Sequence, residues 1–150
     1  MKLYLAAVLA SKATARELLE TLGAVLRITQ LQWELADEFL PTISKDDPTY
    51  SVRLAGIEGM RQSTASVIVG ALGALTDPAH VGGVDDRLRF LKHCRDNLPA
   101  LVPRLTLPSR IETLRHLDDL AADPKLEPLQ PEITLLRDEV VERLRAKSSE

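Results

Sequence analysis

Hydrophobic residues recur at three- and four-residue steps along most of the chain, which is the period of an amphipathic α-helix. The first and longest run covers about residues 2–40. Its helical face is made by Tyr4, Val8, Leu18, Leu22, Val25, Thr29 and Trp33. Leu31 and Leu35 lie on another face of the same helix, so we expect a second surface of it to be covered as well.

The limits of the two longest predicted helices follow from capping residues and prolines. Thr14–Glu17 matches a capping box and marks an alternative start of the first helix, after a break near Ser11. Pro41 ends that helix. Asp47 followed by Pro48 reads as an N-cap and a first helical residue. A second long helix is therefore predicted from there to about Thr76.

The second half predicts three shorter helices. The third covers residues 85–98, and the fourth begins at the capping box Ser109–Glu112. The fifth carries Ile133, Leu136, Val140 and Leu144, and we expect its end to fray from about residue 146. Residues 99–108 hold three prolines and are expected to form at most one helical turn. The expected core positions of the third and fourth helices are Leu88, Leu91, Leu98, Ile111, Leu114, Leu117 and Leu120.

These elements predict an all-α fold, a single helical domain over residues 1–150. Two long antiparallel helices form its spine, and about three shorter helices pack across them. Aromatic residues are only 3% of the chain, which suits a core of aliphatic side chains packed between helices.

One face of the second helix is nearly free of large side chains. The small residues on it are spaced three and four apart and are Gly56, Gly59, Ser63, Ser66, Gly70 and Gly73. Four glycines inside a helix cost roughly 4 kcal/mol of helix propensity relative to alanine, so we expect something to offset them. The uncharged stretch of residues 63–75 is too short to span a membrane.

Three explanations of this small-residue stripe remain open. We favour close packing against another helix of the same chain, the first helix above all, which offers Ser11, Ala15 and Ala36. A symmetric dimer seam is the second explanation. A ligand wall made of exposed backbone is the third.

Charge and cysteine content narrow the classes of partner and compartment. The net charge is −3, and no basic patch is visible in the sequence, so we expect no nucleic-acid partner and no membrane partner. The single cysteine, Cys94, cannot form an internal disulfide. The N-terminal residues resemble a signal peptide only superficially, because their apolar run is short and continues in helical phase. We therefore expect a cytoplasmic protein.

Few side chains in the sequence are candidates for catalysis, phosphate binding or metal binding. His80 lies in a glycine-containing loop that matches no phosphate-binding motif. Glu112 and His116 share a helix face, but a metal needs further ligands. We interpret Cys94, beside His93, as a buried structural thiol. No metal site and no cofactor are expected.

Two arginine–histidine spacings resemble those of HEPN-type ribonuclease domains, which are all-helical and of similar length. They are Arg87 to His93 and Arg110 to His116. The resemblance implies that these residues act on the 2′-hydroxyl and the scissile phosphate of RNA in a dimer cleft. The sequence departs from the pattern, since Leu88 and Ile111 stand where a polar residue is common, and no tyrosine follows either histidine.

The leading functional hypothesis is a small, non-enzymatic protein-interaction module, such as an adaptor, an immunity or antitoxin-like protein, or a regulatory subunit. A protein partner or self-association is expected. The alternatives are a ligand-binding sensor and a HEPN-like ribonuclease, each with its site in the helical bundle.

Overall fold

The computed structural model describes residues 15–76 and 83–148, and within these ranges the chain is an all-α bundle without strands. Its α-helices are α2 (Ala15–Phe39), α3 (Tyr50–Ala74), α4 (Val84–Leu101), α5 (Leu107–Ala122) and α6 (Gln130–Ser148). Short 3-10 segments join them: η1 (Leu40–Thr42), η3 (Val102–Arg104) and η4 (Pro124–Leu129). The predicted start of the first helix lies outside the described residues.

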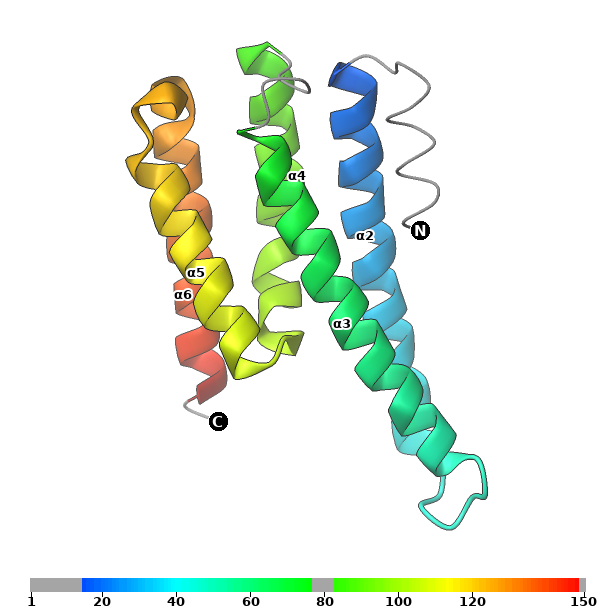
Figure 1. Cartoon of the computed structure of the whole chain (residues 1–150). Coiled ribbons are helices and arrows are strands. Elements are labelled where there is room, and N and C mark those ends of the chain that lie inside the picture. The colour runs from blue at the N-terminus through cyan, green and yellow to red at the C-terminus, as the bar shows by residue number, and fades with distance from the viewer. Residues whose placement is uncertain (1–14, 77–82, 149–150) are drawn as a thin grey trace.

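Successive helices run in alternating directions, and α3 slants across the others (Figure 1). The two longest helices do run antiparallel, but α4 is the helix with extensive contacts on both sides, to α2 and to α6. Helix α5 packs mainly on α6. None of the described helices combines the length and the apolar composition that a membrane span requires.

The core follows the predicted helical faces closely. Leu18, Leu22, Val25 and Trp33 of α2 are buried, and so are most of the leucines expected on α4, α5 and α6. One position expected in the core, Ile111, is instead exposed, at 55%. It lies near the start of α5, where no described helix covers it.

Helix α4 continues through Pro99 to Leu101, which corrects the expectation that residues 99–108 hold at most one turn. A proline inside a helix removes one backbone hydrogen bond and costs about 3 kcal/mol. The segment offsets this cost by burial, since Leu98, Leu101 and Val102 are fully buried and each gains about 1.5–3 kcal/mol. The chain then turns through η3 at Pro103 and begins α5.

Three helix termini differ from the predictions. Helix α3 begins at Tyr50 with Thr49 as its N-cap, and Asp47 instead accepts hydrogen bonds from the backbone N–H and the hydroxyl of Thr49. Helix α5 begins two residues before Ser109, with Thr106 as its N-cap. Helix α6 keeps helical structure to Ser148, beyond the expected fraying point. Local turns made by short polar side chains compete with helix caps at such positions.

A buried hydrogen bond attaches α3 to α2. The indole Nε1–H of Trp33 donates to Oγ1 of Thr64 at 2.9 Å, and the Thr64 hydroxyl donates in turn to the carbonyl of Met60 at 2.7 Å. Both side chains are buried. The bond joins the C-terminal half of α2 to one face of α3. This face carries the large buried side chains Ile68 and Leu72, and we call it the bulky face of α3.

Gly23 of α2 permits a close approach to α4. A Cβ at this position would lie 2.8 Å from Cδ2 and 2.9 Å from Cγ of the His93 ring. Such distances are far below van der Waals contact, so an added methyl group forces the two helices or the imidazole to move. Close packing by a glycine therefore occurs in this bundle at Gly23.

We predict opposite effects for two glycine substitutions. Gly23→Ala should lower the free energy of unfolding by about 1–3 kcal/mol, because the methyl group overpacks the contact with His93. Gly70→Ala should raise it by up to about 1 kcal/mol, because helix propensity improves and no neighbouring group of the described residues lies within 4 Å of the new methyl. Urea denaturation of the two variants and the wild type measures both changes. Stabilisation by Gly23→Ala would contradict the α2–α4 packing.

Candidate functional site

The small-residue stripe of α3 faces outward. Among the described residues, nothing lies within 4 Å of a Cβ placed at Gly56, Gly59, Gly70 or Gly73. Ser63 and Ser66 are likewise exposed. The favoured prediction of an intramolecular seam with the first helix is therefore wrong for the described part of α2. Helix α3 turns its bulky face inward because burying the large aliphatic side chains gains more than burying a glycine surface.

The four ribonuclease candidates do not gather into one site. Arg87 and His93 are six residues apart on α4, as Arg110 and His116 are on α5, and six residues correspond to a rotation of 240° around a helix. His93 faces Gly23 of α2. Arg110 donates to backbone carbonyls at the η3 turn.

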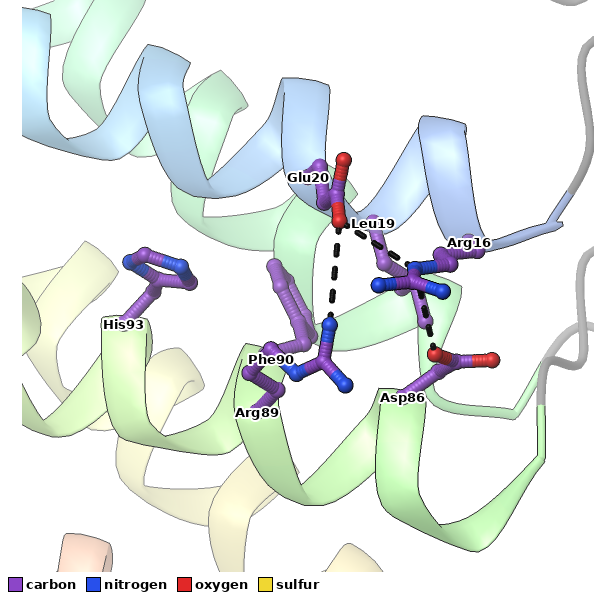
Figure 2. A pocket seen from close by; sticks show the side chains of 7 residues that line it. All are labelled: Arg16, Leu19, Glu20, Asp86, Arg89, Phe90 and His93. Carbon is purple, nitrogen blue, oxygen red and sulfur yellow. Dashed lines mark hydrogen bonds and ion pairs between the residues drawn. The ribbon is translucent and has the colours of Figure 1, made fainter.

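The pocket beside His93 lies where ion pairs connect α2 to α4. Figure 2 shows Arg16 and Arg89 reaching toward the Glu20 carboxylate, with Asp86 on the other side of Arg16. The nitrogen–oxygen distances are 3.4 Å for Arg16–Glu20, 3.8 Å for Arg89–Glu20 and 3.9 Å for Arg16–Asp86. The cavity measures about 10 Å³, which is the space of one water molecule. It is too small to admit a substrate.

Metal-ligating side chains are also dispersed. Among the described residues no group of three or more His, Cys, Asp or Glu side chains is placed to hold a metal ion. Cys94 is fully buried in the core, as the sequence predicted, and burial raises the pKa of its thiol to about 12. His80 lies outside the described residues.

The structure brings together a basic pocket that the sequence analysis missed. It lies where α2, α3, η3, α5 and the end of α6 meet and has a volume of about 240 Å³. Its charged and aromatic lining consists of Trp33, Asp37, Arg61, Arg104, Arg110 and Lys147. Four cationic side chains thus surround one carboxylate, in a protein whose net charge is −3. Below, "basic pocket" refers to this cavity and these six residues.

Backbone carbonyls and one carboxylate hold the cations in place. Arg110 donates through Nη2 to the carbonyl of Pro103 at 2.6 Å and through Nε to that of Leu105 at 3.0 Å. The ammonium group of Lys147 donates to the same Pro103 carbonyl at 3.1 Å. Arg104 pairs with both carboxylate oxygens of Asp37, one of them at 2.8 Å from Nη1. Its guanidinium carbon lies 5.0 Å from the centre of the Trp33 ring, within the range of a cation–π contact.

The basic pocket carries an excess of positive charge. Partial desolvation lowers the pKa of Lys147, and repulsion by Arg110, Arg104 and Arg61 lowers it further, against the opposite effect of Asp37. The Nε atom of Arg61 is buried and has no hydrogen-bond partner among the described residues. An incoming acceptor or negative charge would relieve both conditions.

A second surface feature lies on α2, opposite its core face. Ile28, Leu31, Leu35 and Phe39 follow one another at steps of three and four residues and are 49%, 40%, 53% and 60% exposed. We call this row the outer face of α2. Leu31 and Leu35 were predicted to mark a second covered surface. Within the described residues that surface has no cover.

No family model, curated protein or solved structure matches this chain.

The Cys94 thiol should be inert in the folded protein. Because the side chain is fully buried and its pKa is about 12, reaction with a disulfide reagent has to wait for the fold to open. We expect slow labelling in native buffer and complete labelling of one thiol in guanidinium chloride, both followed by the absorbance of the released reagent. Labelling at the rate of a free thiol in native buffer would contradict this packing.

Proposed function

We propose that this chain is a non-enzymatic protein-interaction module that associates with a second copy of itself through the outer face of α2. The observation that carries the proposal is the exposed row Ile28, Leu31, Leu35 and Phe39. A helix with apolar residues on two opposite sides is typical of one covered on both. Within residues 15–76 and 83–148, the bundle covers only one side of α2.

Charge complementarity favours a second copy as the occupant. Arg27 and Glu34 are exposed at the same edge of the outer face, seven residues apart, where they pair with each other at 3.9 Å, and Leu31 lies close to their midpoint. In a dimer each of them exchanges this partner for the same residue type of the second copy. A two-fold axis near Leu31 pairs the helices antiparallel. It then places Arg27 opposite the partner's Glu34, and the same contact occurs twice. The outer face is in this sense complementary to itself.

The expected association is weak. An axis near Leu31 covers Ile28, Leu31 and Leu35 and leaves Phe39 beyond the contact. Each of these three half-exposed side chains gains about 1 kcal/mol on burial, so the two copies together gain on the order of 6 kcal/mol. Lost translational and rotational freedom costs about 4–15 kcal/mol. The balance predicts a dimer that forms only as the protein concentration rises, and a concentration series is the appropriate experiment.

Leu35→Glu should shift the protein to a monomer at concentrations where the wild type self-associates, because it places a charge at the centre of the outer face. Sedimentation equilibrium over a concentration series measures the shift. Leu135→Glu is the matched control, since Leu135 is 44% exposed on α6 and should leave association unchanged. A wild type that stays monomeric, with Leu35→Glu lowering its melting temperature, would show that the outer face is covered within one chain and would contradict the proposal.

A charge exchange tests the antiparallel arrangement. Arg27→Glu places two carboxylates opposite each other at both ends of the contact, so the association constant should fall several-fold. Adding Glu34→Arg restores opposite charges and should recover most of the loss. Association that the single substitution leaves unchanged would rule out this register.

A further inference from the structure

The basic pocket has the cationic side chains that an anion-binding site requires. Three guanidinium groups and one ammonium group converge on a cavity with one internal carboxylate, Asp37. Arginine forks match the oxygens of phosphate and carboxylate groups in two-point hydrogen bonds. We propose that the basic pocket binds a phosphate group, a function separate from the self-association above.

Charge favours phosphate over a carboxylate ligand. Counting Arg61, Arg104, Arg110 and Lys147 against Asp37, and against Glu58, which pairs with Arg61 at 3.5 Å, leaves two positive charges in excess. A carboxylate neutralises one of them, whereas a phosphate monoester carries about −1.5 to −2 at neutral pH. The buried Nε of Arg61 gives the phosphate a donor that no described residue now satisfies.

An adjoining cavity offers room for the rest of a phosphate ester. It has a volume of about 470 Å³ and shares Trp33, Asp37, Arg104 and Lys147 with the basic pocket. Its further polar lining includes Gln30 and Glu34. The Oε1 atom of Gln30 is buried without a hydrogen-bond partner among the described residues. Such acceptors suit the hydroxyl groups of a small polyol or sugar.

The internal carboxylate of Asp37 occupies part of the site. It accepts two hydrogen bonds from the guanidinium group of Arg104, and a bound phosphate would accept hydrogen bonds from the same group. Phosphate therefore competes with Asp37 for this side chain, and removal of the carboxylate charge should strengthen binding.

Calorimetric titration of the full chain with inorganic phosphate tests the site directly, against chloride at equal ionic strength. We expect saturable binding at a single site. Lys147→Gln and Arg61→Gln should each weaken it about tenfold, the usual effect of losing one charge-assisted hydrogen bond. Asp37→Asn should strengthen it several-fold. The matched control is Arg115→Gln, which removes the same charge from an exposed position of α5 outside the pocket and should change the affinity less than twofold.

Three results would overturn the proposal: no saturable binding at millimolar phosphate, equal losses in Arg115→Gln and Lys147→Gln, or unchanged affinity in both pocket variants. Lys147 lies in the last turn of α6, so its variant remains informative if Arg61→Gln fails to fold. A parallel titration with ribose 5-phosphate distinguishes the source of the phosphate. Tighter binding than that of inorganic phosphate assigns the adjoining cavity to the body of an ester, and equal affinity assigns the site to free phosphate.

Discussion

The packing of the bulky face of α3 against α2, with the hydrogen bond from Trp33 to Thr64 inside it, determines which side of α3 faces outward. That hydrogen bond fixes the position of α3 on α2. It is short, buried and fully satisfied, because the Thr64 hydroxyl accepts from the indole and donates to the Met60 carbonyl. Losing such a partner in the core leaves a polar group unsatisfied and costs about 1–3 kcal/mol. The bond holds the bulky face of α3 against α2, and the small-residue stripe consequently has no close contact with the described helices, although Ser66 and Gly70 line an open groove beside α5. The same Trp33 ring supports Arg104 at the basic pocket.

Helical periodicity in the sequence predicted the all-α fold, the core faces of α2, α4 and α6, and the buried thiol of Cys94. It did not predict the course of the chain at Pro99, because the penalty of proline is local, whereas the burial that offsets it comes from Leu98, Leu101 and Val102 together. Nor did it identify which side of α3 is covered. A stripe of small residues permits close packing, but whether a neighbour lies there depends on tertiary contacts that residue spacing does not encode.

The basic pocket could not be predicted from the sequence, for a related reason. Its cations come from α3, η3, α5 and the last turn of α6, and Arg61 and Lys147 are 86 positions apart in the chain. Between them lie enough acidic residues that the overall charge is slightly negative. A charge balance averaged over sequence conceals a local excess created by folding. The only early sign of the other surface, the outer face of α2, was that Leu31 and Leu35 lay off the core face.

Two surfaces of this protein, the small-residue stripe of α3 and the outer face of α2, are not packed against other parts of the described bundle. Four glycines on α3 cost roughly 4 kcal/mol of helix propensity, a large part of the 5–15 kcal/mol that stabilises a typical domain. Among the described residues no close contact offsets that cost. The outer face of α2 likewise holds four large apolar side chains that the described part of the bundle leaves about half exposed, where polar residues would serve the isolated fold equally well. Stability of the bundle alone therefore explains neither surface. Association with another molecule would account for the outer face of α2, and it would do so without any catalytic group.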